Sequence, residues 1–172
     1  MLGSSHANTM RRALATVGRR GGHQVAAAGI GGARLGSARD RQRLAQIAEE
    51  SRAEAVLLIL GGNDLCERDV DLRELAGQLI ELGEAVRGAG ARAVYFFPVL
   101  PRRVVRRVPP ELYETRRAAA NRIWASRFRG PPVTFINMPA GADMIGRDGV
   151  HLSGKGQRVV LGVVENILRR EA

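Results

Sequence analysis

The sequence predicts an α/β protein, a three-layer α/β/α sandwich around a sheet of five parallel strands. Short apolar segments alternate along the chain with helical patterns, which is the order of consecutive βαβ units. The clearest segment, residues 55–60, reads Ala-Val-Leu-Leu-Ile-Leu and is apolar on both faces, as in a central parallel strand covered by helices on both sides. With 172 residues and 45% hydrophobic residues, the chain is long enough for one core, so we expect a single domain spanning residues 1–172.

The first half of the chain is expected to supply three strands and two helices. Met1 and Leu2 are all that the chain offers for a first strand. The other two strands are expected over residues 24–28 and 55–60. Met10, Leu14 and Val17 recur at helical spacing within a helix over residues 8–20. Ser37 is a suitable N-cap for a second helix that runs to about residue 53.

The second half continues the same alternation. Leucines and Val86 at helical spacing predict a helix over residues 71–87, and Gly88-Ala89-Gly90 ends it. A strand over 93–97, a helix over 111–128 and a last strand over 133–136 follow, before a final helix whose inward face begins at Val159. Because parallel strands present their carboxyl ends at one edge of a sheet, the loops after them are the expected place of the functional site.

The charge is strongly positive and unevenly spread. The formal net charge is +10, and Lys155 is the sole lysine among 27 basic residues. Nine arginines against two glutamates lie between residues 101 and 130, and Arg102, Arg103, Arg106 and Arg107 form a candidate substrate or partner patch that can attract a polyanion or an acidic protein surface. Aromatic residues are not interleaved with these arginines as base stacking would need, so nucleic-acid binding is not expected.

Other composition features exclude several classes. The single cysteine, Cys66, excludes an internal disulfide, and the apolar runs are too short to cross a bilayer. No signal peptide is recognisable, and we expect a cytoplasmic protein or, if the source is viral, a component of a particle. No cluster of residues has the spacing of metal ligands, so no metal and no cofactor are expected.

Polar residues with catalytic potential are placed in three loops. Asp148 and His151 stand three residues apart in a glycine-rich loop ahead of the final helix, a spacing that lets a carboxylate orient an imidazole as a general base. Ser5 offers a hydroxyl at the start of the chain. Asn63, in a Gly-Gly-Asn-Asp turn after the third strand, offers an amide that can stabilise an oxyanion.

These segments resemble the four sequence blocks of the SGNH (GDSL-type) hydrolases, in the family's order and over essentially the whole chain; they are Gly3-Ser4-Ser5, Gly32, Gly61-Gly62-Asn63-Asp64 and Asp148-Gly149-Val150-His151. The resemblance implies a flavodoxin-like sheet and an esterase activity. It assigns Ser5 as the nucleophile, His151 as the general base and Asp148 as its partner. The oxyanion hole would consist of the backbone N–H groups of Ser5 and Gly32 and the side-chain amide of Asn63.

The first block departs from the family pattern. Ser4 stands where the family has an aspartate, which makes Ser4 a second candidate nucleophile. The first strand has two apolar residues ahead of the motif where the family has four or five, so either residues upstream are missing from this chain or the strand is unusually short.

Three functions stay open at this point. The resemblance favours a serine hydrolase that cleaves a carboxylic ester, either an acetyl group on a carbohydrate or another short acyl chain, with a small ester or acylated glycan as substrate. A non-catalytic subunit with the same fold, part of a larger assembly such as a viral particle, is the alternative. A nucleotide-binding protein is weaker, because Gly156 follows Lys155 where a phosphate-binding loop needs Ser or Thr.

Overall fold

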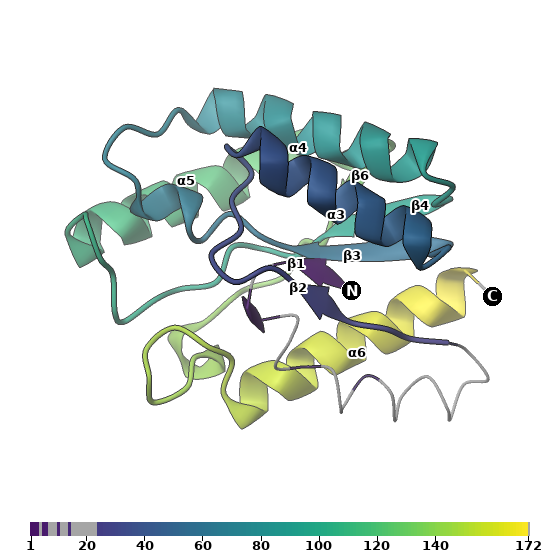
Figure 1. Cartoon of the computed structure of the whole chain (residues 1–172). Helices are drawn as coiled ribbons and strands as arrows, with labels where there is room; N and C mark the ends of the chain where they lie inside the picture. Colours follow the sequence, from purple (N-terminus) through teal and green to yellow (C-terminus); the bar gives the residue numbers. More distant parts are fainter. Residues whose placement is uncertain (4, 7–9, 11–13, 15–23, 172) are drawn as a thin grey trace.

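A six-stranded, mostly parallel sheet forms the centre of the protein (Figure 1). The computed structural model describes residues 1–3, 5, 6, 10, 14 and 24–171. The strands stand in the order β2-β1-β3-β4-β6-β5, and their bounds are β1 Leu2–Gly3, β2 Ala28–Gly29, β3 Ala55–Ile59, β4 Ala93–Phe96, β5 Arg129–Gly130 and β6 Val133–Phe135. The predicted α/β class is therefore confirmed.

The predicted number of five strands is wrong, because β5 adds a sixth. The other five strands all run parallel to one another. β5 pairs antiparallel with β6, with Arg129 opposite Thr134 and Gly130 opposite Val133. β5 is only two residues long and turns back into β6 through Pro131 and Pro132. A two-residue segment is too short to show an alternation of polar and apolar residues, and two prolines after it are typical of a loop.

Helices cover both faces of the sheet. They are α3 Ala38–Glu50, α4 Leu72–Gly88, α5 Pro110–Arg127 and α6 Gly154–Glu171. Figure 1 shows α3, α4 and α5 on one side of the sheet and α6 on the other. The core divides accordingly, with Val56 and Leu58 of β3 packed in the cluster that contains α3, α4 and α5, and Leu57 and Ile59 in the cluster that contains α6. The predicted three-layer sandwich is confirmed.

Most predicted boundaries agree with the structure. Ser37 caps α3 as expected, since its hydroxyl accepts from the backbone N–H of Asp40 at 3.2 Å, but α3 ends at Glu50 and not near residue 53. Asp71 caps α4 in the same way. The largest boundary error is the second strand, because β2 covers Ala28–Gly29 and not residues 24–28. Most of the helix predicted over residues 8–20 lies outside the described residues, although Met10 and Leu14 are fully buried as expected.

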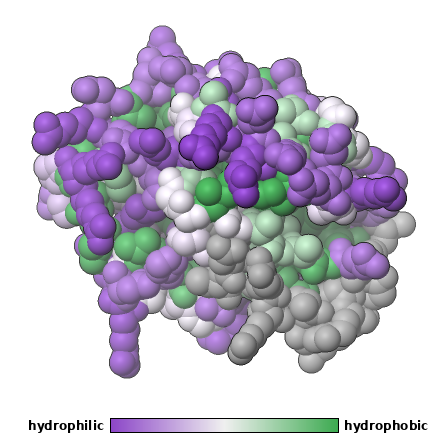
Figure 2. Space-filling view, viewed as in Figure 1, coloured by the Kyte–Doolittle hydropathy of each residue, from purple (hydrophilic) through white to green (hydrophobic). Residues whose placement is uncertain are grey.

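The two ends of the sheet differ in character. At the amino ends of the central strands a hollow of about 460 Å³ is lined mainly by apolar residues, among them Val25, Ile47, Val56 and Ile167. Figure 2 shows hydrophobic surface emerging below α3, whereas the helix surfaces above it are largely hydrophilic. The loops that carry Ser5, Asn63 and His151 leave the sheet at its opposite, carboxyl end.

Candidate active site

Ser5 and His151 are brought together by the carboxyl edge of the sheet. Ser5 follows β1, the strand paired with both β2 and β3, and it has helical conformation. His151 lies in the loop between β6 and α6. The Nε2 atom of His151 is 3.0 Å from Oγ of Ser5, which is a hydrogen-bond distance.

Asp148 holds the other side of the His151 ring. Its Oδ2 lies 2.7 Å from Nδ1 of His151, and its Oδ1 accepts from the backbone N–H groups of Val150 and His151 at 3.0 and 2.9 Å. These two backbone hydrogen bonds, followed by the one from the imidazole, hold the pKa of Asp148 well below its usual range. The carboxylate is consequently ionised at neutral pH.

The ionised carboxylate determines which nitrogen of the neutral imidazole carries the proton. A carboxylate can only accept hydrogen bonds, so Nδ1 of His151 must be the donor toward Asp148. Nε2 is then left with its lone pair toward Ser5 Oγ. This chain of three side chains can accept a proton from the serine hydroxyl, which is the property of a hydroxyl nucleophile with an attached general base.

The loop that carries Asp148 and His151 is attached to the arginine-rich loop after β4. The backbone N–H of Arg103 donates to Gly149 O at 2.8 Å, and its guanidinium Nη2 donates to Ile145 O at 3.1 Å and to Gly146 O. Gly149 has a φ of 75°, and an added Cβ would lie 2.7 Å from Cγ2 of Val104. The two loops thus pack closely at a position that only glycine fits.

Asn63 is fixed at both ends of its amide group. Its Nδ2 donates to Ala33 O at 3.0 Å, and its Oδ1 accepts from Nη2 of Arg102 at 2.8 Å. Nδ2 has a second hydrogen, so one N–H remains for a ligand. Asn63 thus has one further side-chain donor, and its place in an oxyanion hole stays a prediction.

Gly32 lies in the loop after β2, with a φ of 76°. Because Gly3 of β1 pairs with Gly29 of β2, the chain segments that lead to Ser5 and to Gly32 leave the sheet at the same level. Ser4, the second candidate nucleophile, lies outside the described residues.

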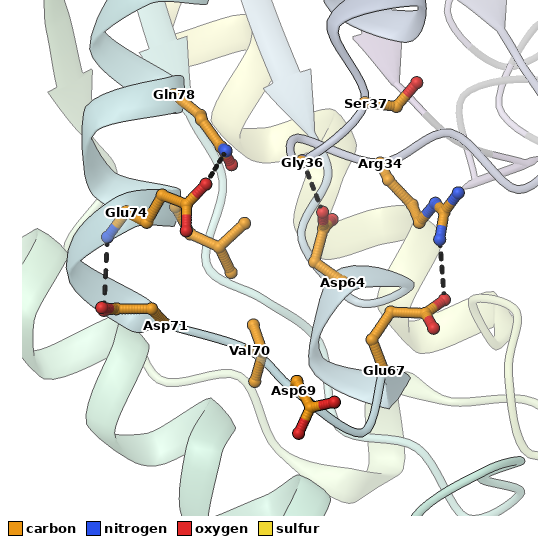
Figure 3. Close-up of a pocket in the computed structure, with 11 residues that line it drawn as sticks. Arg34, Gly36, Ser37, Asp64, Glu67, Asp69, Val70, Asp71, Glu74 and Gln78 are labelled. Carbon is orange, nitrogen blue, oxygen red and sulfur yellow. Dashed lines mark hydrogen bonds and ion pairs between the residues drawn. The ribbon is translucent and has the colours of Figure 1, made fainter.

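Asp64, whose individual role the sequence did not reveal, ties the loop after β2 to the Asn63 turn. It is buried, and its carboxylate accepts from the backbone N–H groups of Leu35 at 3.1 Å and Gly36 at 2.8 Å. Burial raises the pKa of Asp64, and these backbone hydrogen bonds oppose the shift. Figure 3 shows Asp64 pointing to Gly36 at one side of an acidic pocket of about 220 Å³.

His6 is a buried neighbour of the triad. The side chain is 5% exposed, and its ring centroid lies 5.7 Å from that of His151 in an edge-to-face arrangement. Burial lowers the pKa of His6 to about 4, and the positive charges of Arg102 and His151 add to this effect while Asp148 opposes it. Its position directly after Ser5 was the one sequence signal that could have indicated its place beside the triad.

A small cavity lies beside the triad and is lined by His6, Ile59, Leu60, Gly62, Leu100, Arg102 and Tyr113. Its volume is about 10 Å³, the space of a single water-sized probe. Tyr113 lines one side of this cavity. Its hydroxyl donates a hydrogen bond to Leu100 O at 2.7 Å, which holds the ring in place.

The four arginines of the candidate patch have different environments. Arg102 and Arg103 make the contacts with Asn63 and with the Asp148 loop described above. Arg107 pairs with both carboxylate oxygens of Glu67, at 2.5 and 2.6 Å, and Arg106 is exposed. Three of the four side chains are thus engaged within the chain, and recruitment of a polyanion by this loop stays a prediction.

The described residues contain no group of three His, Cys, Asp or Glu side chains that could hold a metal ion. Lys155, the lysine of the phosphate-loop-like segment, is paired with Asp143. Within the same part of the chain, no helix is long and apolar enough to span a membrane.

Comparison with known proteins extends these observations. Residues 3–159 match the model of the GDSL-like Lipase/Acylhydrolase family. TesA is 21% identical with a TM-score of 0.71, and the match covers 98% of this chain and 96% of that chain. A lipase/acylhydrolase from Enterococcus faecalis is 16% identical with a TM-score of 0.61, covering 98% and 93%.

A catalytic mutant of an acetylxylan esterase from Geobacillus stearothermophilus is 14% identical with a TM-score of 0.68, covering 97% of this chain and 91% of that chain. No curated protein matches the chain by sequence. At these identities the solved structures establish a common fold, in agreement with the sandwich described above.

Proposed function

The chain belongs to the GDSL-like lipase/acylhydrolase family, and we propose that it hydrolyses carboxylic esters with Ser5 as its nucleophile. One observation carries the proposal. The side chains of Ser5, His151 and Asp148 form a continuous hydrogen-bonded chain, with contacts of 3.0 and 2.7 Å. That arrangement suits proton removal from a serine hydroxyl and has no evident structural purpose in an exposed loop.

The reaction proceeds in two halves. Nε2 of His151 accepts the proton of Ser5 Oγ while that oxygen attacks the ester carbonyl carbon, and the ionised Asp148 stabilises the resulting imidazolium. The imidazolium then donates this proton to the leaving alcohol, which gives an acyl-enzyme. In the second half, Nε2 of His151 accepts a proton from water while the water oxygen attacks the acyl carbonyl carbon. The bond between this carbon and Ser5 Oγ then breaks, the imidazolium returns its proton to Oγ, and the carboxylic acid leaves.

Three donors would stabilise the negative charge that develops on the carbonyl oxygen. They are the backbone N–H groups of Ser5 and Gly32 and the free N–H of the Asn63 amide. Ser5 has helical conformation. The mechanism needs no cofactor.

The substrate we propose is an acetyl or other short acyl ester, carried on a carbohydrate. The fold shared with an acetylxylan esterase supports a carbohydrate as the alcohol part.

Labelling with a fluorophosphonate probe tests the nucleophile. We expect one adduct, mapped to Ser5 by peptide mass spectrometry and abolished in His151→Ala. An adduct on Ser4 would reassign the nucleophile. The absence of any adduct on folded protein would reject the proposal and favour the non-catalytic subunit instead.

A panel of p-nitrophenyl esters tests the substrate class. For the proposed short acyl group, turnover should fall steeply from acetate to octanoate. Equal rates along the series would contradict a short acyl preference, and release of acetate from acetylated xylo-oligosaccharides would support a carbohydrate substrate.

A further inference from the structure

The orientation of the Asn63 amide is determined by two neighbours of opposite character. Ala33 O can only accept a hydrogen bond, and it takes one from Nδ2 at 3.0 Å. The guanidinium of Arg102 can only donate, and it gives one to Oδ1 at 2.8 Å. A flipped amide would place two acceptors together at Ala33 and two donors together at Arg102. Both contacts would be lost, and Oδ1 would replace the free N–H.

Arg102 is itself held in place around this contact. Its Nη1 lies 3.4 Å from Sγ of Cys66, and the guanidinium carbon lies 5.9 Å from the ring centroid of Tyr113. A Cβ at Gly62 would be 2.9 Å from Nη2 of Arg102, so the guanidinium packs directly on the backbone of the turn that contains Asn63. A donor held on several sides requires little reorganisation during a reaction.

The guanidinium of Arg102 also lies close to the buried side chain of His6. The guanidinium lines the small cavity beside the triad together with His6 and Gly62. Its charge already disfavours a second positive charge at His6, where it is the largest contribution to the lowered pKa after burial.

We propose that Arg102 is a positioning residue, which holds the Asn63 amide with its N–H toward the reacting carbonyl oxygen. Arg102 acts through Asn63 and not by contact with substrate. The inference rests on the proposed ester hydrolysis and adds a residue outside the four sequence blocks, supplied by the loop after β4.

A double-mutant cycle between Arg102 and Asn63 tests the proposal with p-nitrophenyl acetate. Asn63→Ala should lower kcat by about 100- to 1,000-fold, as loss of one oxyanion donor does. Arg102→Ala should lower kcat by about 10- to 100-fold and leave KM within about twofold, because only the transition state needs the oriented amide. In the Asn63→Ala background, Arg102→Ala should lower kcat by less than about threefold, because the amide that Arg102 orients is no longer present.

Two further variants control for charge and folding. Arg43→Ala removes the same charge from an exposed site on α3, and it should leave kcat unchanged. Arg102→Met keeps the aliphatic stem and removes the guanidinium, so it replaces Arg102→Ala in the cycle if the alanine variant does not fold. The proposal would be overturned if the Arg102 substitution lowered kcat by the same factor with and without Asn63. It would also be overturned if that substitution left the kcat of the otherwise unmodified protein unchanged.

A measurement without catalysis separates this inference from the proposed function. The side-chain amide signals of Asn63 in a ¹⁵N-correlated NMR spectrum, identified by their loss in Asn63→Ala, should shift in Arg102→Met and not in Arg43→Ala. Unchanged signals would refute the contact. If unmodified protein fails to react with the fluorophosphonate, the hydrolase proposal fails, and the NMR result still decides whether Arg102 orients Asn63.

Discussion

The Nε2 atom of His151 lies 3.0 Å from Oγ of Ser5, although 146 positions separate the two residues in the sequence. β1 brings Ser5 to the carboxyl edge of the sheet, and the loop between β6 and α6 brings His151 to the same place. The contact exists only in the folded chain, so any change that displaces either loop should reduce reactivity before it unfolds the protein.

Asp148→Asn should lower kcat/KM by about 1,000- to 10,000-fold without unfolding the protein. The Asn Oδ1 would keep the backbone hydrogen bonds from Val150 and His151, which turns its NH₂ toward Nδ1 of the ring. The imidazole would then carry its proton on Nε2 and could not accept one from Ser5. Steady-state kinetics on p-nitrophenyl acetate measure the effect.

Asp143→Asn is the matched control for that change. Asp143 lies in the same loop and pairs with Lys155 at the surface. Its loss should change kcat/KM by less than about twofold, as for an exposed ion pair. A large loss in this variant, together with a small one in Asp148→Asn, would place the acid of the triad at Asp143.

Arg103→Ala should slow the labelling of Ser5 by about tenfold, because the loop that carries His151 would lose its attachment at Ile145 and Gly146. The rate constant of fluorophosphonate labelling measures the reactivity of the serine directly. Arg147→Ala removes an exposed arginine from the same loop and should label at the normal rate. Equal rates in both variants would show that the attachment does not control the triad.

His6 should make the protein less stable in mild acid. In the unfolded chain its pKa is near 6.5, whereas burial and the charges of Arg102 and His151 lower it to about 4 in the fold. As the pH falls through this window, the unfolded state binds the proton first, so the free energy of unfolding decreases, by up to about 3 kcal/mol.

Urea denaturation between pH 7 and pH 4 measures this dependence. His6→Gln lacks the titrating group, and its free energy of unfolding should fall less steeply over the same range. Parallel curves for the two proteins would mean that other groups account for the acid sensitivity.

Two glycines of α4 should respond in opposite directions to alanine. At Gly83 an added Cβ would lie 2.2 Å from Cγ2 of Val133 and 3.2 Å from Pro132 O, so Gly83→Ala should destabilise the protein by about 1 to 3 kcal/mol. At Gly77 an added Cβ would meet no neighbouring atom within 4 Å, so Gly77→Ala should stabilise the helix by about 0.5 to 1 kcal/mol. Urea denaturation of both variants checks the pair, and a loss at both positions would show that α4 tolerates no added methyl group.

The fold followed from local patterns wherever an element was long enough to have one. Residues 55–60 read as a buried strand, and Ser37 and Asp71 marked helix starts through side-chain chemistry that does not depend on distant residues. β5 and the position of β2 could not be predicted. Each has two residues, and such short pairings are determined by the neighbouring strand.

In the candidate site, too, residues in local motifs were predicted and contacts between distant segments were not. Ser5, Asp148 and His151 were singled out because the motifs that contain them are local, and the structure brings their side chains together. The burial of His6 and the contact between Arg102 and Asn63 were not predicted. Both arise only when segments far apart in the sequence meet.

The shortness of the two outermost strands has a consequence for behaviour at high concentration. β2 and β5 each contain two residues, and the exposed Arg129 begins β5. Fibril growth by edge pairing needs a long, flat row of free backbone groups, which such strands do not offer, and a charged side chain at the edge opposes it further. The architecture that gathers the loops of Ser5, Asn63 and His151 at one end of the sheet therefore also leaves little strand edge for fibril growth at its sides.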